Sequence, residues 1–297
     1  MAAATGRKAF SLLLCGLATA ALALPVPAAS IELELALPAV DAAELLAWGR
    51  VPLPEDGTTL QVHADFPDDA PLLVGDVAFH SLTADISPDG TVVMRSATPA
   101  KAATAAPSAR LDECADPAYE PTGPQWRSSD MPVQWRFRRA SVPDGLGTFR
   151  SQYALQSAHQ VWSRARTNCA APAEVSLGFR FGGDSRRKVG YDGVNLVDFG
   201  PLGGGALAMS YTWFEGARIL EVDLRLNRGY GWTNRPGGKN RFQVGNVAAH
   251  EIGHQLGLDD LADPHGALTM FGRISRGETA KMTLGRGDLR GASSLSP

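Results

Sequence analysis

Two histidines and a glutamate near the carboxyl end of the chain have the types and spacing that metal chemistry needs. They stand in the sequence HEIGHQLGLDD at residues 250–260. In a helix, four residues correspond to about 400 degrees of rotation, so His250 and His254 share one face and can bind one metal ion. Glu251, next to the first ligand, is placed to hold a water molecule rather than the ion. The spacing therefore separates two metal ligands from a general base.

A third ligand must come from the chain that follows this helix. Gly257 can adopt the left-handed conformation that ends helices, and three residues of extended chain then bring Asp260 back toward the ion. A carboxylate oxygen ligates zinc at about 2.0 to 2.2 Å, so aspartate is acceptable there, and a fourth position stays open for water. The alternatives for this third ligand are Asp259, Asp263, His265 and Glu278.

The elements that position these residues can be read from the hydrophobic pattern. We expect the helix of the motif to begin near Asn246 as its N-cap and to end at Gly257. The 3.6-residue pattern of residues 148–166 predicts an earlier helix. Its expected core residues are Phe149, Tyr153, Ala154, Ala158, Val161 and Trp162. Alternating or apolar runs predict strands at residues 131–138, 175–182, 193–200, 206–214 and 218–227.

The amino-terminal third has a different organisation. Residues 1–29 contain Arg7 and Lys8 ahead of an apolar run and small residues suited to cleavage, so we expect an export signal and a secreted or periplasmic protein. Residues 30–96 predict short strands, as in TLQVHADF, and form a propeptide-like or accessory region whose histidines we expect to be ordinary surface or strand residues. Residues 97–110 are rich in Ala, Pro, Thr and Ser and predict a linker. Residues 111–297 remain for the main domain.

Composition narrows the class of protein. The net charge of −3 gives no electrostatic reason to expect a nucleic acid partner, and 44% hydrophobic residues are ordinary for a globular protein. Once the signal is removed, two of the three cysteines remain, and an even number in an oxidising compartment predicts a disulfide between Cys114 and Cys169. The alternative is that Cys114 reaches the metal as a thiolate and blocks it.

The extended motif and the sequence ALTMF at residues 267–271 resemble the metal site of metzincin peptidases, most closely that of bacterial matrixin-type enzymes. By this resemblance Met270 belongs to the Met-turn beneath the metal. The resemblance covers about residues 128–297 and implies an α+β domain with a twisted mixed sheet, two long helices and a carboxyl-terminal helix. Matrixins have histidine where this chain has Asp260, a replacement that resembles the snapalysin group.

The resemblance implies a zinc metalloendopeptidase with one catalytic Zn²⁺, in which water attacks a peptide carbonyl and Glu251 carries the proton. It also implies that the strand at Ala206, Leu207 and Ala208 aligns a protein or peptide substrate through its backbone. Histidines for a structural zinc are missing from the middle strands, and Ca²⁺ is compatible with the resemblance but has no assigned residues. We expect a monomer without stable membrane association. The alternatives are a non-catalytic zinc-containing binding module and a thermolysin-like peptidase that uses Glu278.

Overall fold

The computed structural model describes residues 42–52, 57–74, 77–99, 110–170, 175 and 177–297. All of them belong to one compact unit, Leu37–Pro297. The expected export signal and most of the expected linker lie outside the described residues, so both stay predictions. Within the described ranges, no helix is long and apolar enough to cross a membrane.

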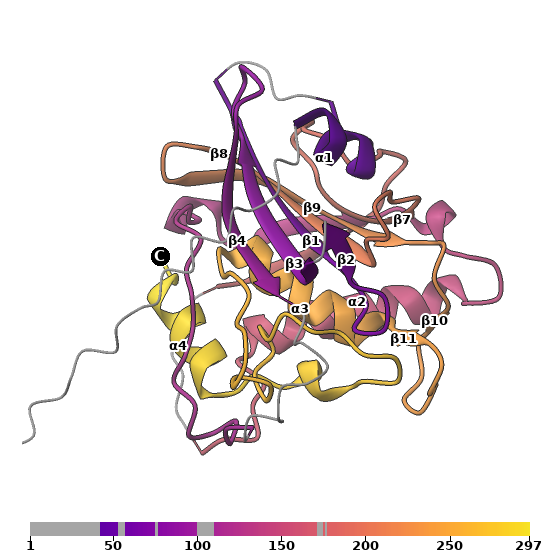
Figure 1. Ribbon diagram of the computed structural model, residues 1–297, viewed down its shortest axis with the longest axis vertical. Coiled ribbons are helices and arrows are strands. Elements are labelled where there is room, and N and C mark those ends of the chain that lie inside the picture. Colours follow the sequence, from indigo (N-terminus) through magenta and orange to yellow (C-terminus); the bar gives the residue numbers. More distant parts are fainter. Residues whose placement is uncertain (1–41, 53–56, 75–76, 100–109, 171–174, 176) are drawn as a thin grey trace, which may run out of the picture. The chain divides into compact units, whose positions relative to one another are not determined.

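One mixed sheet of nine strands, as far as the structure describes the chain, forms the framework (Figure 1). Its order is β2-β3-β1-β8-β9-β7-β5-β6, and β4 pairs with β3. The neighbours β9, β7, β5 and β6 run parallel, whereas β8 is antiparallel to both β1 and β9. The strands are β1 (Thr59–Asp65), β2 (Leu72–Val74), β3 (Val77–Ile86), β4 (Val92–Pro99), β5 (Val133–Phe137), β6 (Phe179–Asp184), β7 (Asn195–Gly200), β8 (Ala208–Glu215) and β9 (Arg218–Asn227).

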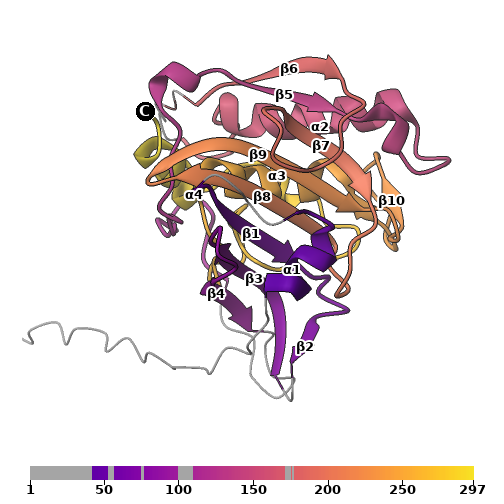
Figure 2. The ribbon, with the colours of Figure 1, turned by 90° about the horizontal axis from the view of Figure 1, so that it is seen from above.

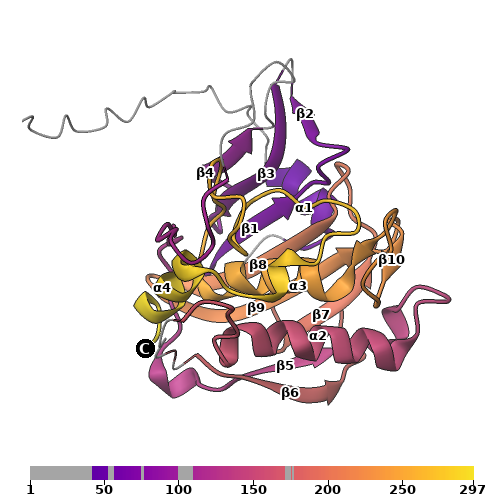
Figure 3. The ribbon, with the colours of Figure 1, turned by 90° about the horizontal axis from the view of Figure 1, so that it is seen from below.

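The helices cover both faces of this sheet. They are α1 (Ala42–Gly49), α2 (Thr148–Ser163), α3 (Val244–Leu256) and α4 (Arg286–Ser294), with short 3₁₀ turns at Ser128–Asp130, Arg139–Ser141 and Ala280–Met282. Two further strands, β10 (Trp232–Thr233) and β11 (Phe242–Gln243), pair with each other just before α3. Figure 2 shows α1 in front of the sheet, and Figure 3, from the opposite side, shows α2, α3 and α4 in front.

The main apolar core lies between the sheet and α2, α3 and α4. Every residue of α3 is buried, because α2, the sheet and the chain after α3 surround it. Trp162 on α2 is fully buried and its indole N–H donates to the carbonyl of Ala249 on α3 at 2.7 Å, so the largest side chain of this contact leaves no unpaired donor. A second core, under α1, joins β1 and β3 to β8. Both cores hold β8 in place, and the main core also holds α3.

The predicted α+β class with a mixed sheet is confirmed, and the structure adds two features and corrects one expectation. The amino-terminal strands are present, but they continue the sheet of the main domain through β1 and β8. Helix α1 was not expected, although its sequence AAELLAWG is rich in good helix formers. Phe149 and Tyr153 are 80% and 73% exposed rather than in the core, because α2 packs through the face that carries Leu155 and Trp162.

Candidate metal centre

Helix α3 presents two imidazoles to one buried point. It begins at Val244, two residues before the predicted start, because the Asn246 side chain accepts a hydrogen bond from the Lys281 backbone instead of capping the helix. His250 and His254 are both fully buried, and their Nε2 atoms lie 3.2 Å apart. Gly257 ends the helix with φ +102°, a left-handed conformation that favours glycine.

The other nitrogen of each ring is held by a backbone carbonyl. Nδ1 of His250 is 2.7 Å from the carbonyl oxygen of Thr269, and Nδ1 of His254 is 2.8 Å from that of Leu258. Because a carbonyl only accepts hydrogen bonds, each Nδ1 carries the hydrogen, and each Nε2 turns its lone pair toward the shared point. Metal-ligating histidines are oriented in this way.

Asp260 comes back to the same point after the Gly257 turn. Its Oδ1 lies 3.1 Å from Nε2 of His250 and 3.8 Å from Nε2 of His254. Gly272 gives it room, since a Cβ there would lie 3.0 Å from the carboxyl carbon. The structure therefore brings together the three residues proposed as ligands from the sequence.

The alternative third ligands have other partners. Nδ1 of His265 is 2.9 Å from Asp116, Asp263 pairs with Arg273 at 3.0 Å, and Glu278 accepts a hydrogen bond from the Ser275 backbone at 3.2 Å. Asp259 accepts hydrogen bonds from the hydroxyls of Thr83 and Ser96, and forms with His63 and His254 a second group of close donors. None of these four residues lies in the group that contains His250.

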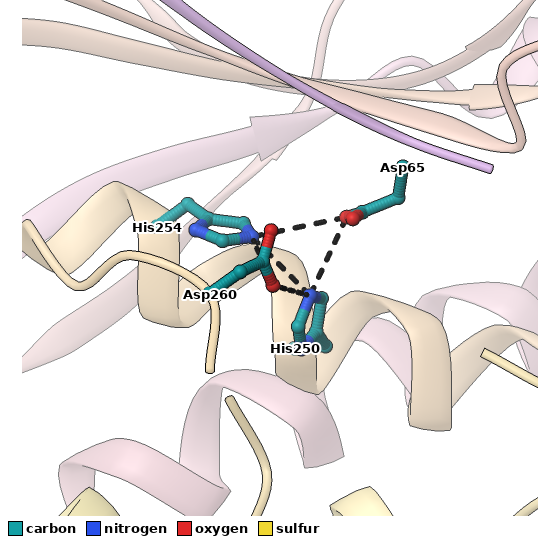
Figure 4. A group of neighbouring side chains, drawn as sticks. All are labelled: Asp65, His250, His254 and Asp260. Carbon is teal, nitrogen blue, oxygen red and sulfur yellow. Dashed lines mark hydrogen bonds and ion pairs between the residues drawn. The ribbon is translucent and has the colours of Figure 1, made fainter. Parts of the chain in front are cut away.

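A fourth donor comes from strand β1 and was not expected from the sequence. Oδ2 of Asp65 lies 3.4 Å from Nε2 of His250 and 3.7 Å from Nε2 of His254 (Figure 4). The only local signal was the alternation of TLQVHADF, which places Asp65 on the polar side of a strand with His63. That side faces α3 instead of solvent: His63 lies in a strand, which is one of the two expected settings, and it is 1% exposed rather than at the surface.

The four donors fit a divalent metal ion such as zinc. Bonds of about 2.0 to 2.2 Å in a tetrahedral site place neighbouring donors about 3.3 to 3.6 Å apart, close to the observed 3.1 to 3.8 Å. Within the described part of the chain, both oxygens of Asp65 and Oδ1 of Asp260 are buried without a hydrogen-bond partner. Buried carboxylates of this kind need a cation, and two nitrogens with two oxygens are ligands that zinc accepts.

The ionisable side chains of the site strongly affect one another's pKa values, because burial removes the water that would screen their charges. Burial alone would lower the pKa of His250, but the carboxylates of Asp65 and Asp260 raise it to about 9. Burial would raise the pKa of Asp65, but His250 and His254 lower it well below its usual value. The centre therefore attracts a cation, which is either protons on the imidazoles or a metal ion.

Glu251 stands beside this centre on the side of β8. Its Oε2 accepts a hydrogen bond from the hydroxyl of Ser210 at 2.7 Å, and its Oε1 has no partner among the described residues. Burial first, and then the negative charge of Asp65, raise the pKa of Glu251 well above its usual value. One oxygen is thus fixed while the other remains free to hold a proton.

Met270 lies against α3, the helix that carries His250 and His254 and is called the metal helix below. It is buried, and a Cβ at position 253 would overlap its sulfur, so the absence of a side chain at Gly253 lets Met270 pack against α3 at that residue. The turn that carries Met270 is held by Asp288, which accepts hydrogen bonds from the backbone N–H groups of Thr269 and Met270. The same turn supplies the carbonyl that orients His250.

The two cysteines are away from the metal donors. Cys114 and Cys169 form a disulfide, as expected from their number, which contradicts the alternative in which Cys114 is a free thiolate on the metal.

The strand residues proposed to align a substrate are all buried, and Ala208 is paired with Asp65. Along this stretch, β1 therefore occupies the edge of β8 that the sequence had suggested for a substrate.

Comparison with known proteins agrees with this geometry. Residues 125–296, more than half of the chain, match the model of the family Matrixin (peptidase M10). Human (Homo sapiens) matrix metalloproteinase-20 is 28% identical over 150 residues, which cover 48% of this chain and 27% of the human protein. The chain therefore spans well under two thirds of that relative. The match to the family model shows that the chain belongs to the matrixin family of peptidases.

Proposed function

We propose that this protein is a zinc-dependent endopeptidase in which His250, His254 and Asp260 hold the ion and Glu251 is the general base. Support comes chiefly from the convergence of the three donors beside an unpartnered oxygen of Glu251. Zn²⁺ bound there would supply a Lewis acid that polarises a peptide carbonyl and makes water more acidic. With two imidazoles and one carboxylate, the set matches the ligand types of catalytic zinc sites.

Glu251 would carry the proton between water and the departing amine. The hydroxyl of Ser210 holds Oε2, and Oε1 has no hydrogen-bond partner among the described residues, so we assign the proton transfer to Oε1. Burial and the charge of Asp65 raise the pKa of Glu251, which favours the protonated form that returns the proton. Main-chain groups at the start of β8 and just before it, those of Ala206, Leu207 and Ala208, would align the peptide as an added strand.

Further parts of the function remain proposals of the same kind. We propose that the substrates are proteins or peptides, that residues 1–29 export the chain, and that the active chain is a monomer. Glu278, the ligand required by a thermolysin-like reading, is held by Ser275 outside the donor group. That reading therefore has no support from the geometry.

A second function is favoured by one observation. Asp65 adds a fourth donor, and a zinc ion with four protein ligands is typical of structural sites, whereas catalytic sites keep one position open. A non-catalytic zinc-containing binding module would have this closed arrangement permanently. An endopeptidase would have it only until β1 moves away from β8.

Cleavage of a quenched fluorescent peptide library tests both functions. The assay uses the intact chain and a chain cut at a protease recognition sequence inserted between Pro99 and Arg110, and size-exclusion chromatography checks that the piece carrying β1 has left, since β1 lies along β8 in the intact chain. We expect the cut chain to cleave peptides, and Glu251→Gln in the cut chain to lower kcat by about 10² to 10⁴ while zinc stays bound. Zinc binding without cleavage by the cut chain would favour the binding module, and unchanged kcat in Glu251→Gln would reject Glu251 as the base.

A further inference from the structure

Strand β1 lies where an extended peptide would add to the sheet. It pairs antiparallel with β8 over its full length, from Thr59 opposite Phe214 to Asp65 opposite Ala208. The other edge of β8 pairs with β9, so both edges of β8 are occupied along this stretch. Peptide recognition by strand addition needs a free edge. In the folded chain, β1 has taken the edge of β8 that lies beside the metal centre.

The two sides of β1 have different chemistry. Leu60, Val62 and Ala64 pack in the core under α1, together with Tyr211 and Trp213 of β8. The alternate residues, Gln61, His63 and Asp65, are polar and 1% exposed. A row of buried polar side chains is unusual for a strand unless it meets polar groups. In this row His63 and Asp65 meet the metal helix, whereas Gln61 donates to Asp85 on β3.

His63 fixes the register of β1 over the metal helix. Its ring stacks on that of His254, with centroids 4.1 Å apart and 16° between the planes. The hydroxyl of Thr83 on β3 lies 2.9 Å from Nδ1 of His63 and donates to Asp259 at 2.9 Å. A shift of β1 by one residue would turn His63 and Asp65 to the opposite side. The stacking therefore supports the placement of Asp65 at the metal.

Among the described residues, the ion partners of Asp65 are the two facing imidazoles, whose Nε2 atoms lie 3.4 and 3.7 Å from its Oδ2. Both of its oxygens lack a hydrogen-bond partner, and the side chain is fully enclosed. The two facing imidazoles carry their hydrogens on Nδ1, where backbone carbonyls accept them. With neutral imidazoles this buried carboxylate would be unpaired, which is costly, and a metal ion shared with His250 and His254 removes that cost.

We propose that Asp65 is a fourth ligand of the ion and that β1 fills the place of a substrate strand, so the folded chain holds its own metal centre closed. The inference rests on the proposed function for the identity of the ion. Two carboxylates and two imidazoles saturate a tetrahedral ion, which leaves no position for water. Peptide cleavage then requires both that Asp65 leave the ion and that β1 leave β8.

The experiment measures access of a small ligand to the ion in the full chain. Co²⁺ replaces Zn²⁺, because its visible absorption reports its coordination, and acetohydroxamate is titrated as the added ligand. Wild type is compared with Asp65→Ala, Asp65→Asn and Asp68→Ala. Asp68 is the matched control, since it lies just after β1 with its side chain 43% exposed and paired with His80.

We expect Asp65→Ala to bind acetohydroxamate at least tenfold more tightly than wild type and Asp68→Ala, with a changed Co²⁺ spectrum before the ligand is added. Asp65→Asn should lie between them, since an amide is a weaker ligand of the same shape. If Asp65→Ala fails to fold, as judged by circular dichroism, Asp65→Asn is compared with wild type instead. Equal affinities and identical spectra in all folded chains would overturn Asp65 as a ligand.

The occupation of β8 by β1 is tested by a separate measurement. Hydrogen exchange of the β8 amides that face β1 should be slow in the intact wild-type chain, because β1 accepts their hydrogen bonds. Rapid exchange there, as at a free sheet edge, would overturn the occupation of β8 by β1.

Failure of the proposed function has a different signature. If Asp65→Ala opens the ion to acetohydroxamate but the cut chain still cleaves no peptide, the closed centre stands and the endopeptidase assignment fails. If wild type binds acetohydroxamate as tightly as Asp65→Ala and the cut chain cleaves peptides, the endopeptidase stands and the closed centre fails. A wild-type chain that binds neither Zn²⁺ nor Co²⁺ contradicts both.

Discussion

Oδ2 of Asp65 lies 3.4 Å from Nε2 of His250, so a strand near the amino end of the described chain reaches the helix near its carboxyl end. Asp260 approaches the same nitrogen at 3.1 Å. Two carboxylates from distant parts of the sequence thus face one pair of imidazoles. Their contributions to metal binding overlap, and single substitutions will underestimate each of them.

Removal of the two carboxylates, singly and together, separates their contributions. In Asp260→Ala three donors remain, because Asp65 stays in place. We therefore expect about one zinc per chain to be retained. Its affinity should fall about 100-fold or more, which exceeds the loss typical of removing a residue that only orients a ligand. The double variant Asp65→Ala/Asp260→Ala should lose zinc during dialysis. His265→Ala is the control, since His265 is bound to Asp116, and its affinity should stay near that of wild type.

Chelator competition and metal analysis by mass spectrometry measure both quantities. Complete loss of zinc from Asp260→Ala alone would show that Asp65 contributes nothing. Loss of zinc from His265→Ala would instead show that the chain after Gly257 is placed differently.

The metal helix was predictable because its signals are local. The spacing of His250 and His254, the glycine that ends the helix and the return of Asp260 all fall within a few residues, where helix geometry fixes the distances. The start of the helix was wrong by two residues, because the Asn246 side chain is used by a distant segment. Local chemistry therefore predicted the helix but not its exact beginning.

Asp65 was not predictable because its place depends on the pairing of two distant strands. Alternation in TLQVHADF indicates two faces, but it does not say which face is buried, or against what. A polar face normally predicts solvent, and here the registration of β1 with β8 places it over a metal helix. The exposure of Tyr153 has a more local reason, since it lies nine residues before Trp162, which corresponds to opposite sides of α2.

Two glycines of α3 should respond in opposite ways to alanine. A Cβ at position 253 would overlap the sulfur of Met270 and lie 2.8 Å from the Trp162 ring, so Gly253→Ala should destabilise the fold by about 1 to 3 kcal/mol or more. In Gly245→Ala the new Cβ would meet the flexible Met282 side chain at 3.2 Å, and better helix propensity should keep the change between about zero and 1 kcal/mol of stabilisation. Urea unfolding measures both. Equal effects would mean that Met270 does not pack against Gly253.

Asp288 should affect metal binding although it lies outside the donor group. Its buried carboxylate accepts backbone N–H groups of Thr269, Met270 and Gly285, and Thr269 in turn orients His250. Asp288→Ala leaves these donors unpaired, so we expect about 3 kcal/mol or more of destabilisation and zinc affinity lowered about 10- to 100-fold. Calorimetric zinc titration and urea unfolding test this against an exposed carboxylate, Asp144→Ala. Unchanged zinc affinity in a folded Asp288→Ala would contradict the link through Thr269.

His159 should make the fold sensitive to acid. Burial, with the ring stacked on Trp135 at a centroid distance of 3.8 Å, lowers its pKa from 6.5 to about 3, although the hydrogen bond that Nδ1–H donates to the Leu155 carbonyl acts in the opposite direction. The unfolded chain therefore binds a proton on His159 below about pH 6.5, whereas the folded chain does not bind it until the pH falls to about 3. Stability is unaffected above this window and falls as the pH decreases through it, by up to about 1.4 kcal/mol per pH unit.

His159→Phe keeps an aromatic ring against Trp135 and removes the proton. Unfolding free energies of the variant should therefore fall less steeply than those of wild type between pH 6.5 and pH 4, as measured in urea at saturating Zn²⁺. Release of zinc in acid is common to both chains, so it cancels in their difference. Parallel curves would mean that the folded chain accepts the proton on His159 near its ordinary pKa, which the enclosed stack against Trp135 does not allow.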